Sequence, residues 1–112
     1  MKKQIIVTGG RGYDDFNMVS DILDLFDIGA IIQGGANGAD KLAREYAKLK
    51  HLEYTTVIAE WDKHGRAAGP IRNRQMLQMF PEAIVLAFPG GAGTDNCVKT
   101  AVELNMIVLR VQ

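Results

Sequence analysis

Segments with two different hydrophobic periods follow one another along the chain. Runs of β-branched and other apolar residues predict short buried strands at residues 5–8, 30–33, 54–59, 83–88 and 106–111. Apolar residues at helical spacing predict intervening helices at about residues 15–27, 37–50, 70–80 and 95–104. Residues 60–69 have no clear period, and we expect them to form a long loop.

This alternation of strands and helices indicates the architecture. It is typical of parallel strands that are joined by right-handed crossovers. No linker, repeat or low-complexity segment interrupts the pattern. We therefore predict an α/β fold, a Rossmann-like doubly wound parallel sheet of about five strands with helices on both faces, in a single domain over residues 1–112.

The composition narrows the class of protein. The 112 residues include 13 Lys and Arg and 13 Asp and Glu, so the chain lacks the broad cationic field of a general DNA-coating protein. Its one cysteine, Cys97, excludes an intramolecular disulfide and a multi-cysteine zinc site, and we expect neither metal nor cofactor. The apolar run at residues 5–7 is too short for a signal peptide or a membrane span, so we expect a cytoplasmic protein without membrane contact.

Glycine pairs follow three of the predicted strands, at Gly9-Gly10, Gly34-Gly35 and Gly90-Gly91. In a doubly wound sheet, ligands bind beyond the carboxyl ends of the strands. Glycine lets the backbone approach a ligand closely, and the helix that follows offers free N–H groups and a positive dipole end. A single pair is explained by a tight turn alone. Three pairs at one edge of the sheet predict a site for phosphate or a nucleotide.

A basic segment lies between the second and third glycine pairs. Residues 63–81 contain no acid and five basic side chains, at Lys63, His64, Arg66, Arg72 and Arg74. A solvated basic surface is the alternative interpretation. Asn73 shares a helix face with Met76, Leu77 and Phe80, so we expect it to point toward the glycine edge. Arg72 and Arg74 are about 200° apart on a helix, so we expect only one of them to face the site.

Two common glycine motifs are missing. The chain has no Gly-x-x-x-x-Gly-Lys-Ser/Thr, which disfavours a Walker-type NTPase. Gly10 and Gly12 follow the first strand, but the third glycine of the dinucleotide fingerprint is replaced by Asp15. Hydride transfer is therefore a weak option.

The glycine loops and the basic segment together resemble the SLOG superfamily, which includes the Lonely-guy phosphoribohydrolases and the DprA/Smf DNA-processing proteins. Within it, the chain is most similar to the short, stand-alone YspA/YpsA-like branch, which is largely of unknown function. Four segments carry the resemblance in chain order: Val7-Thr8-Gly9-Gly10-Arg11, Gly34-Gly35-Ala36-Asn37-Gly38-Ala39-Asp40, Gly65-Arg66-Ala67-Ala68-Gly69-Pro70-Ile71-Arg72-Asn73 and Ala87-Phe88-Pro89-Gly90-Gly91-Ala92-Gly93-Thr94. The Pro-Gly-Gly-x-Gly-Thr loop is the most specific of these.

The resemblance implies a Rossmann-like fold with a nucleotide-derived ligand at the glycine edge. We therefore expect the ligand to contact Thr8, Gly9, Gly10, Arg11, Gly34, Gly35, Ala36, Asp40, Arg66, Arg72, Asn73, Pro89, Gly90, Gly91, Gly93 and Thr94.

Catalysis by a phosphoribohydrolase-like site is in doubt. The family's catalytic glutamate lies three residues after the Thr of Pro-Gly-Gly-x-Gly-Thr, where this chain has Cys97. Cleavage of an N-glycosidic bond needs a carboxylate, and a thiol supplies neither its charge nor its basicity. The catalytic arginine corresponds to Arg72 or Arg74, and we favour Arg72 because Asn73 follows it. Asp40 is the best substitute acid, although a structural hydrogen bond to glycine-loop amides explains it equally well.

Other side chains near the predicted site allow simpler roles. Cys97 shares a helix face with Ala101 and Leu104, so we expect a buried, inert thiol. Asp95 suits a capping role at its helix. Trp61 is suited to stacking on a base or ribose and equally to a hydrophobic plug or a subunit contact. His64 has no nucleophile partner, so a surface or phosphate contact is favoured over catalysis.

Three functions remain as hypotheses. The first is a sensor, carrier or sequestering protein for a nucleotide-derived small molecule. The second is an N-glycoside hydrolase acting on a nucleoside monophosphate, with Arg72 and Asp40 as catalytic residues. The third, binding of single-stranded nucleic acid, is disfavoured by the zero net charge. A homo-oligomer is compatible with all three.

Overall fold

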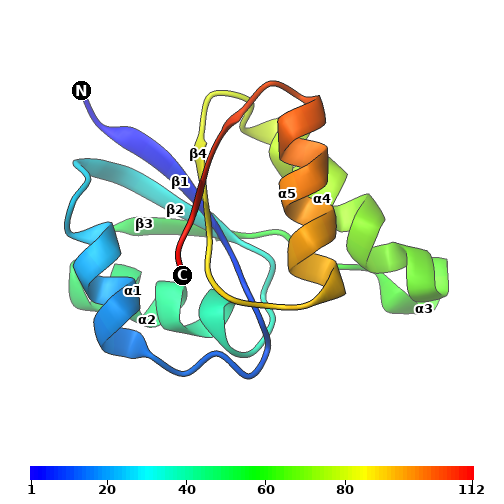
Figure 1. The fold of residues 1–112 in the computed structure, drawn as a ribbon, viewed down its shortest axis with the longest axis horizontal. Helices are drawn as coiled ribbons and strands as arrows, with labels where there is room; N and C mark the ends of the chain where they lie inside the picture. The colour runs from blue at the N-terminus through cyan, green and yellow to red at the C-terminus, as the bar shows by residue number, and fades with distance from the viewer.

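Five parallel strands form the central sheet of the protein. The computed structural model describes all of residues 1–112 and places the strands in the order β3-β2-β1-β4-β5 (Figure 1). Every neighbouring pair is parallel. The strands span Lys3–Thr8 (β1), Ile28–Gln33 (β2), Glu53–Thr56 (β3), Ile84–Ala87 (β4) and Ile107–Arg110 (β5). The predicted α/β, doubly wound architecture is confirmed.

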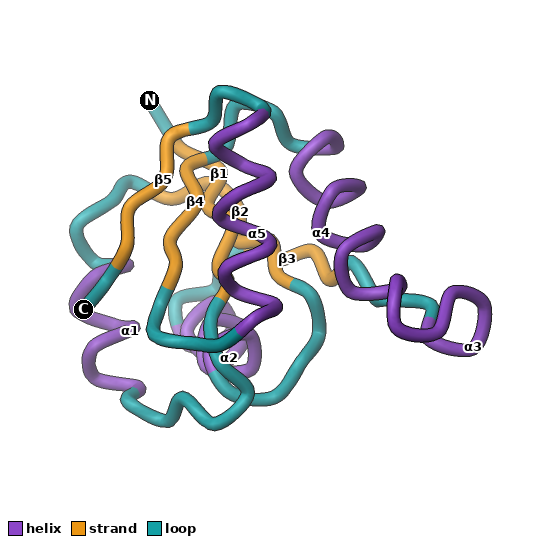
Figure 2. Tube along the Cα trace, turned by 45° about the vertical axis from the view of Figure 1, so that its right-hand side comes forward, coloured by secondary structure: helices purple, strands orange, loops and turns teal.

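Helices cover both faces of this sheet. The helices α1 (Phe16–Leu23) and α2 (Ala39–Leu49) pack on one face, and α4 (Ala68–Met79) and α5 (Ala92–Glu103) pack on the other (Figure 1). A short helix, α3 (Trp61–His64), and a 3-10 turn at Gly65–Ala67 precede α4 and project from the body of the molecule (Figure 2). No helix combines the length and the apolar character that crossing a membrane requires.

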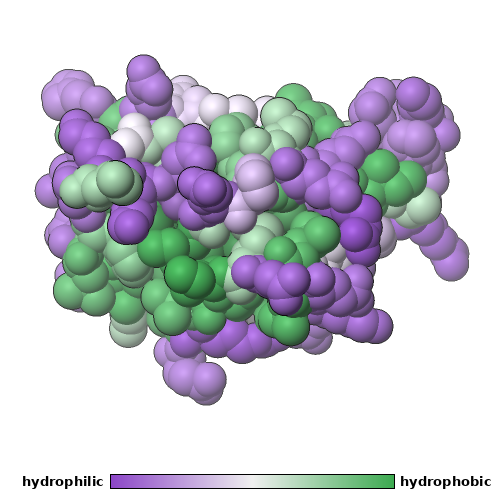
Figure 3. All heavy atoms as spheres, turned by 90° about the horizontal axis from the view of Figure 1, so that it is seen from above, coloured by the Kyte–Doolittle hydropathy of each residue, from purple (hydrophilic) through white to green (hydrophobic).

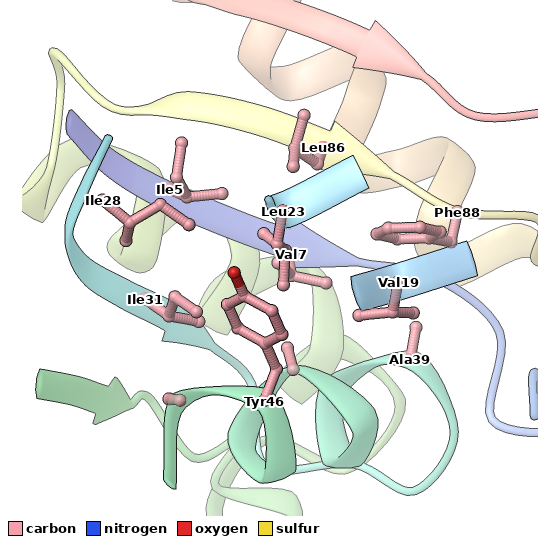
Figure 4. Packing of buried hydrophobic residues seen from close by; sticks show 12 residues of the cluster. Ile5, Val7, Val19, Leu23, Ile28, Ile31, Ala39, Tyr46, Leu86 and Phe88 are labelled. Carbon is pink, nitrogen blue, oxygen red and sulfur yellow. The ribbon is translucent and has the colours of Figure 1, made fainter. Parts of the chain in front are cut away.

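Successive side chains of β1 point to opposite faces and enter two separate cores. Ile5 and Val7 belong to the core under α1 and α2, whereas Ile6 belongs to the core under α4 and α5. Figure 4 shows the first core, in which the ring of Tyr46 points from α2 toward the strands. The Tyr46 hydroxyl donates a hydrogen bond of 2.6 Å to Asp24 Oδ1 after α1. The alternation explains why the central strands appear as unbroken apolar runs.

Several helix boundaries differ from the sequence-based prediction, and α1 ends at Leu23 instead of at about residue 27. Residues 60–69 were predicted as a long loop, but they contain α3, the 3-10 turn and the start of α4. The short helix α3 buries none of its residues, so it has no apolar period that a sequence could display. Helix α5 begins at Ala92 and therefore includes Gly93 and Thr94, which were predicted to lie in a loop.

The two edge strands leave apolar side chains exposed. Tyr54 on β3 and both Ile107 and Leu109 on β5 are exposed. In Figure 3, apolar side chains gather along one side of the face shown, whereas hydrophilic side chains dominate the right-hand end, where α3 projects. The hydrophilic end around α3 lies next to the candidate site, because Trp61 of α3 lines the cavity there.

Candidate functional site

The carboxyl ends of β1 and β4 lie side by side, and the chain leaves them in opposite directions. After β1, the chain continues to β2 and β3 on one side of β1. After β4, which lies on the other side of β1, the chain continues outward to β5. Such a reversal is where doubly wound sheets bind ligands. Backbone hydrogen bonds tie the loops together there: Gly10 N–H donates to the Pro89 carbonyl at 2.9 Å, and Ala39 N–H donates to the Gly10 carbonyl at 3.2 Å. The loops after β1, β2 and β4 therefore form one connected unit.

A cavity of about 470 Å³ opens beyond these strand ends. That volume is within the range of about 300–1,000 Å³ that is usual for small-molecule sites. All three glycine loops contribute to the wall, together with α3, α4 and α5. The lining residues are Thr8, Gly9, Gly10, Arg11, Ala36, Asp40, Trp61, Arg66, Gly69, Pro70, Arg72, Asn73, Gly91, Ala92, Gly93, Thr94 and Asn96.

The charged side chains of the cavity are mostly cationic. Arg11, Arg66 and Arg72 line it, and Asp40 is its one acid. Asp40 is buried, and its Oδ2 accepts hydrogen bonds from the backbone N–H of Gly34 at 3.1 Å and of Ala36 at 3.2 Å. Asp40 therefore has the structural role that the sequence suggested, a hydrogen bond to glycine-loop amides. The remaining positive charge favours an anionic ligand.

Arg72 is held by carbonyl groups instead of carboxylates. Its Nη1 donates hydrogen bonds to the carbonyl oxygens of Gly34 at 2.7 Å and Val57 at 3.3 Å, and its Nε donates to Asn73 Oδ1 at 2.9 Å. None of the three salt bridges in the structure involves it. Arg72 is half-buried, and a guanidinium that is partly removed from water without a direct ion-pair partner would be stabilised by an anion bound beside it. Of the two arginines, Arg72 lines the cavity and Arg74 does not.

Arg74 lies on the other side of α4. Its Nη2 pairs with Glu103 Oε2 at 3.3 Å, and both side chains are about half exposed. Residues two positions apart on a helix are separated by about 200°, so Arg72 and Arg74 point to opposite sides of α4.

Asn73 joins α4 to the first turn of α5. It is buried, and its Nδ2 donates to the Gly93 carbonyl at 3.3 Å and to Asn96 Oδ1 at 3.0 Å. No side chain caps the N-terminus of α5, where Gly91 is the N-cap. The unpaired N–H groups and the positive dipole end of this helix therefore face the cavity through Gly91, Ala92 and Gly93. A phosphate is suited to such a position.

Cys97 lies behind this first turn, in the core between α5 and the sheet. Its side chain is fully buried, as expected for an inert thiol. Burial raises the pKa of Cys97 to about 11, against opposing effects from a hydrogen bond to Thr8 and the charge of Arg72. The thiol is therefore protonated near neutral pH and cannot replace a catalytic carboxylate.

Burial also raises the pKa of Asp40. The two amide hydrogen bonds and the charges of Arg72 and Arg44 act in the opposite direction, because each favours the ionised carboxylate. A buried carboxyl group with a raised pKa that lines a cavity is able to donate or accept a proton, so Asp40 is a candidate for proton transfer.

Four of the predicted contact residues do not line the cavity. Gly34 lies behind Arg72, and a Cβ at this position would overlap the guanidinium. Gly35 has a φ of +78° and lines a neighbouring cavity of about 260 Å³. Pro89 and Gly90 have structural roles. The Pro89 carbonyl accepts a hydrogen bond from the Gly10 N–H, and a Cβ on Gly90 would overlap Thr94 Oγ1.

Several side chains near the site differ from expectation or were not expected. Asp95 does not cap α5, because its Oδ1 pairs with Arg110 on β5 at 3.1 Å. His64 does not line the cavity. The lining residues outside the predicted contact set are Trp61, Gly69, Pro70, Ala92 and Asn96. The sequence had suggested Trp61 as one candidate for stacking, and Gly69, Pro70 and Ala92 lie inside the glycine motifs, but Asn96 had no sequence signal.

Two comparisons with known proteins bear on this site. The sequence model of the YspA, cpYpsA-related SLOG family matches residues 3–64, which run from β1 to the end of α3. The chain is also 30% identical to the Gene 61 protein of Mycobacterium phage D29 over 119 aligned residues. That alignment covers 96% of this chain and 94% of the phage protein.

Proposed function

The chain belongs to the YspA, cpYpsA-related SLOG family, and we propose that it binds a nucleotide or nucleotide-derived small molecule at the cavity beyond β1 and β4. Membership in this family suggests a nucleotide-related function. We propose further that the protein acts as a sensor, carrier or sequestering protein and retains its ligand unchanged.

The position of Arg72 carries this proposal. The Arg72 guanidinium is held in orientation by two backbone carbonyls and forms no direct salt bridge with a carboxylate. It shares a cavity with the uncapped N-terminus of α5. Together they provide a fixed charge and several N–H donors, which is the combination that a phosphate group requires.

The glycines of α5 support the same assignment. A Cβ on Gly91 or Gly93 would meet no protein atom within 4 Å, so packing does not require glycine at either position. Both residues line the cavity. A ligand that approaches the backbone closely is a reason for glycine at such positions.

The acid–base groups favour binding over turnover. Cys97 stands where the related phosphoribohydrolases have a glutamate, and its buried thiol is protonated near neutral pH. Asp40 uses one oxygen to hold the loop after β2. Neither group is available as a solvent-exposed carboxylate for stabilising an oxocarbenium ion.

One observation favours hydrolysis of an N-glycoside as a second candidate. Asp40 lines the cavity, and burial raises its pKa. A carboxyl group with a raised pKa is able to act as a general acid toward a leaving base. In that case Arg72 would hold the phosphate and Asp40→Asn would abolish release of the base, while binding of the intact nucleotide would persist.

The test is an incubation of the purified protein with nucleoside monophosphates, cyclic nucleotides, NAD and ADP-ribose, followed by mass spectrometry of retained and altered species. We expect one species to be retained intact at one equivalent per chain. Arg72→Ala should abolish retention, whereas the matched control Arg74→Ala should preserve it, because Arg74 lies outside the cavity.

The other outcomes are distinct. Appearance of a free base with time would replace the binding proposal with the hydrolase. Retention that survives Arg72→Ala would remove the assigned role of this arginine. Failure of every compound to be retained or changed would contradict the proposed ligand class, and oligonucleotides would be tested next.

A further inference from the structure

A cation–π pair stands at the edge of the cavity. The guanidinium carbon of Arg11, in the loop after β1, lies 5.8 Å from the ring centroid of Trp61 on α3. Trp61 is 48% exposed, although it is the largest side chain in the chain. A half-exposed indole offers a large aromatic surface with a polar N–H at its edge. Arg11 forms no salt bridge and covers part of that surface.

The pair also separates two hollows. Arg11, Trp61, Ala36 and Arg72 line both the main cavity and the neighbouring cavity of about 260 Å³. Trp61 already lines both hollows, and moving the Arg11 side chain away from the indole would free the part of the ring that the guanidinium covers. A flat group entering there would have the ring on one side and Arg72 within the same cavity.

The backbone around Trp61 permits such an entry. Helix α3 buries no residue, so no side chain anchors it in either core. The indole contacts α4 at a residue without a side chain, because a Cβ on Gly69 would lie 3.4 Å from the ring carbon Cη2 of Trp61. Figure 2 shows α3 projecting from the sheet at this end of α4.

We infer that the Trp61 indole is the stacking platform for the planar base of the bound nucleotide, with the Arg11 guanidinium displaced from the ring face when the base enters. The inference rests on the proposed function, because it concerns the same ligand. Aromatic stacking recognises the π-face that every base carries, so it would give affinity for the base with little choice among bases. Larger purine rings should bind more tightly than pyrimidines.

A second cation–π pair provides an internal comparison. Lys48 Nζ lies 5.9 Å from the ring centroid of Tyr54 on the edge strand β3, and Tyr54 is 41% exposed. Its distance and exposure are close to those of the Arg11–Trp61 pair, but Tyr54 lines neither the main cavity nor the neighbouring one. Tyr54→Ala is therefore a matched control for Trp61→Ala.

The experiment measures calorimetric affinities for two probes, AMP and ribose 5-phosphate, which lacks the base. Base stacking on an aromatic side chain contributes about 1–3 kcal/mol by alanine substitution, which corresponds to a change of about 5- to 150-fold. We expect Trp61→Ala to weaken AMP binding within that range and to change ribose 5-phosphate binding less than about threefold. Trp61→Phe should restore most of the AMP affinity, and Tyr54→Ala should change neither probe.

Intrinsic fluorescence gives an independent readout, because Trp61 is the one tryptophan of the chain. AMP should alter the emission of the wild-type protein at saturation, whereas ribose 5-phosphate should not. Equal loss of both probes in Trp61→Ala, or loss of neither, would overturn the stacking role while the proposed function stands. Failure of both probes to bind the wild-type protein would overturn stacking of AMP on Trp61, whereas the proposed function itself is contradicted only when no compound of the nucleotide panel is retained.

Discussion

The glycine loops after β2 and β4 are similar in sequence but differ in what surrounds them. The loop after β2 is filled by the protein's own side chains: Gly34 lies against the Arg72 guanidinium and donates its N–H to Asp40. The loop after β4 continues into α5, where a Cβ on Gly91 or Gly93 would meet no atom within 4 Å. One loop supports charged side chains, and the other presents bare backbone to the cavity.

This difference divides the glycines of the site into two kinds. At Gly34 and Gly90, the missing side chain is required by neighbouring protein atoms. At Gly91 and Gly93, the missing side chain leaves space that the protein does not fill. Substitution with alanine should therefore have opposite consequences for folding at the two kinds of position, and both should affect binding.

The largest effect is expected at the filled loop. In Gly34→Ala, the new Cβ overlaps the Arg72 guanidinium, so the arginine must leave its two carbonyl partners. Loss of these hydrogen bonds should lower the free energy of unfolding by about 1–3 kcal/mol, which a urea titration would measure. Calorimetry should show at least a tenfold loss of AMP affinity. Wild-type stability together with wild-type affinity would show that Arg72 has no fixed position.

The opposite result is expected at the open loop. Gly93→Ala adds a methyl group to the cavity wall and should weaken AMP binding by about tenfold, a loss of about 1.4 kcal/mol. The same change should raise the free energy of unfolding by about 0.4–1 kcal/mol, because alanine restricts the unfolded chain more than glycine does. Gly12→Ala is the matched control, since a Cβ there also meets no atom within 4 Å and Gly12 lies outside the main cavity. Unchanged affinity in Gly93→Ala would remove this glycine from the binding surface.

A smaller effect concerns the thiol behind the open loop. The pKa of Cys97 is raised from its ordinary value of 9.0 to about 11 by burial, so the folded protein holds the proton that the unfolded chain releases above pH 9. The resulting stability is complete below pH 9 and is lost as the pH rises toward 11. The wild-type protein should lose about 1 kcal/mol between pH 8 and pH 10 relative to Cys97→Ala. Urea titrations of both proteins at the two pH values would check this.

The buried position of Cys97 also predicts that its thiol reacts slowly. Thiol-modifying reagents should label Cys97 slowly at pH 8 under native conditions and quickly in denaturant. Rapid labelling of the native protein, or identical pH profiles for the two variants, would contradict the burial of a protonated thiol.

The smallest effect is expected on the outer face of α4. Arg74→Ala removes a half-exposed ion pair with Glu103, and exposed pairs contribute about 0.2–1 kcal/mol. AMP affinity should be unchanged, which separates this arginine from Arg72. A loss of affinity comparable to that of Arg72→Ala would reverse the assignment of the two arginines.

The sheet and the edge that carries the cavity were predictable, because apolar runs mark the strands and glycine pairs mark their carboxyl ends. Buried central strands produce unbroken apolar runs, and a glycine pair ends three of them. The choice between Arg72 and Arg74 followed from helical geometry together with the resemblance to related proteins. The placement of Asn73 followed from its position on the face of Met76 and Leu77.

The remaining features depend on contacts between distant segments. No local signal distinguishes a glycine that packs against Arg72 from one that faces open space, so Gly34 and Gly93 appeared equivalent. Helix α3 lacks an apolar period because it buries nothing. Asp95 has the position of a capping residue, but pairing with Arg110 on β5 takes its carboxylate. These outcomes are properties of the tertiary structure.

An NMR titration of the ¹⁵N-labelled protein with AMP tests the central claim most directly. The contrast between the two loops predicts saturable shifts that are largest at the backbone amides of Gly91, Ala92, Gly93 and Thr94, with smaller shifts at Gly34 and Gly35. Shifts confined to Gly34 and Gly35, or the absence of saturable shifts throughout the cavity, would contradict phosphate binding at the open loop.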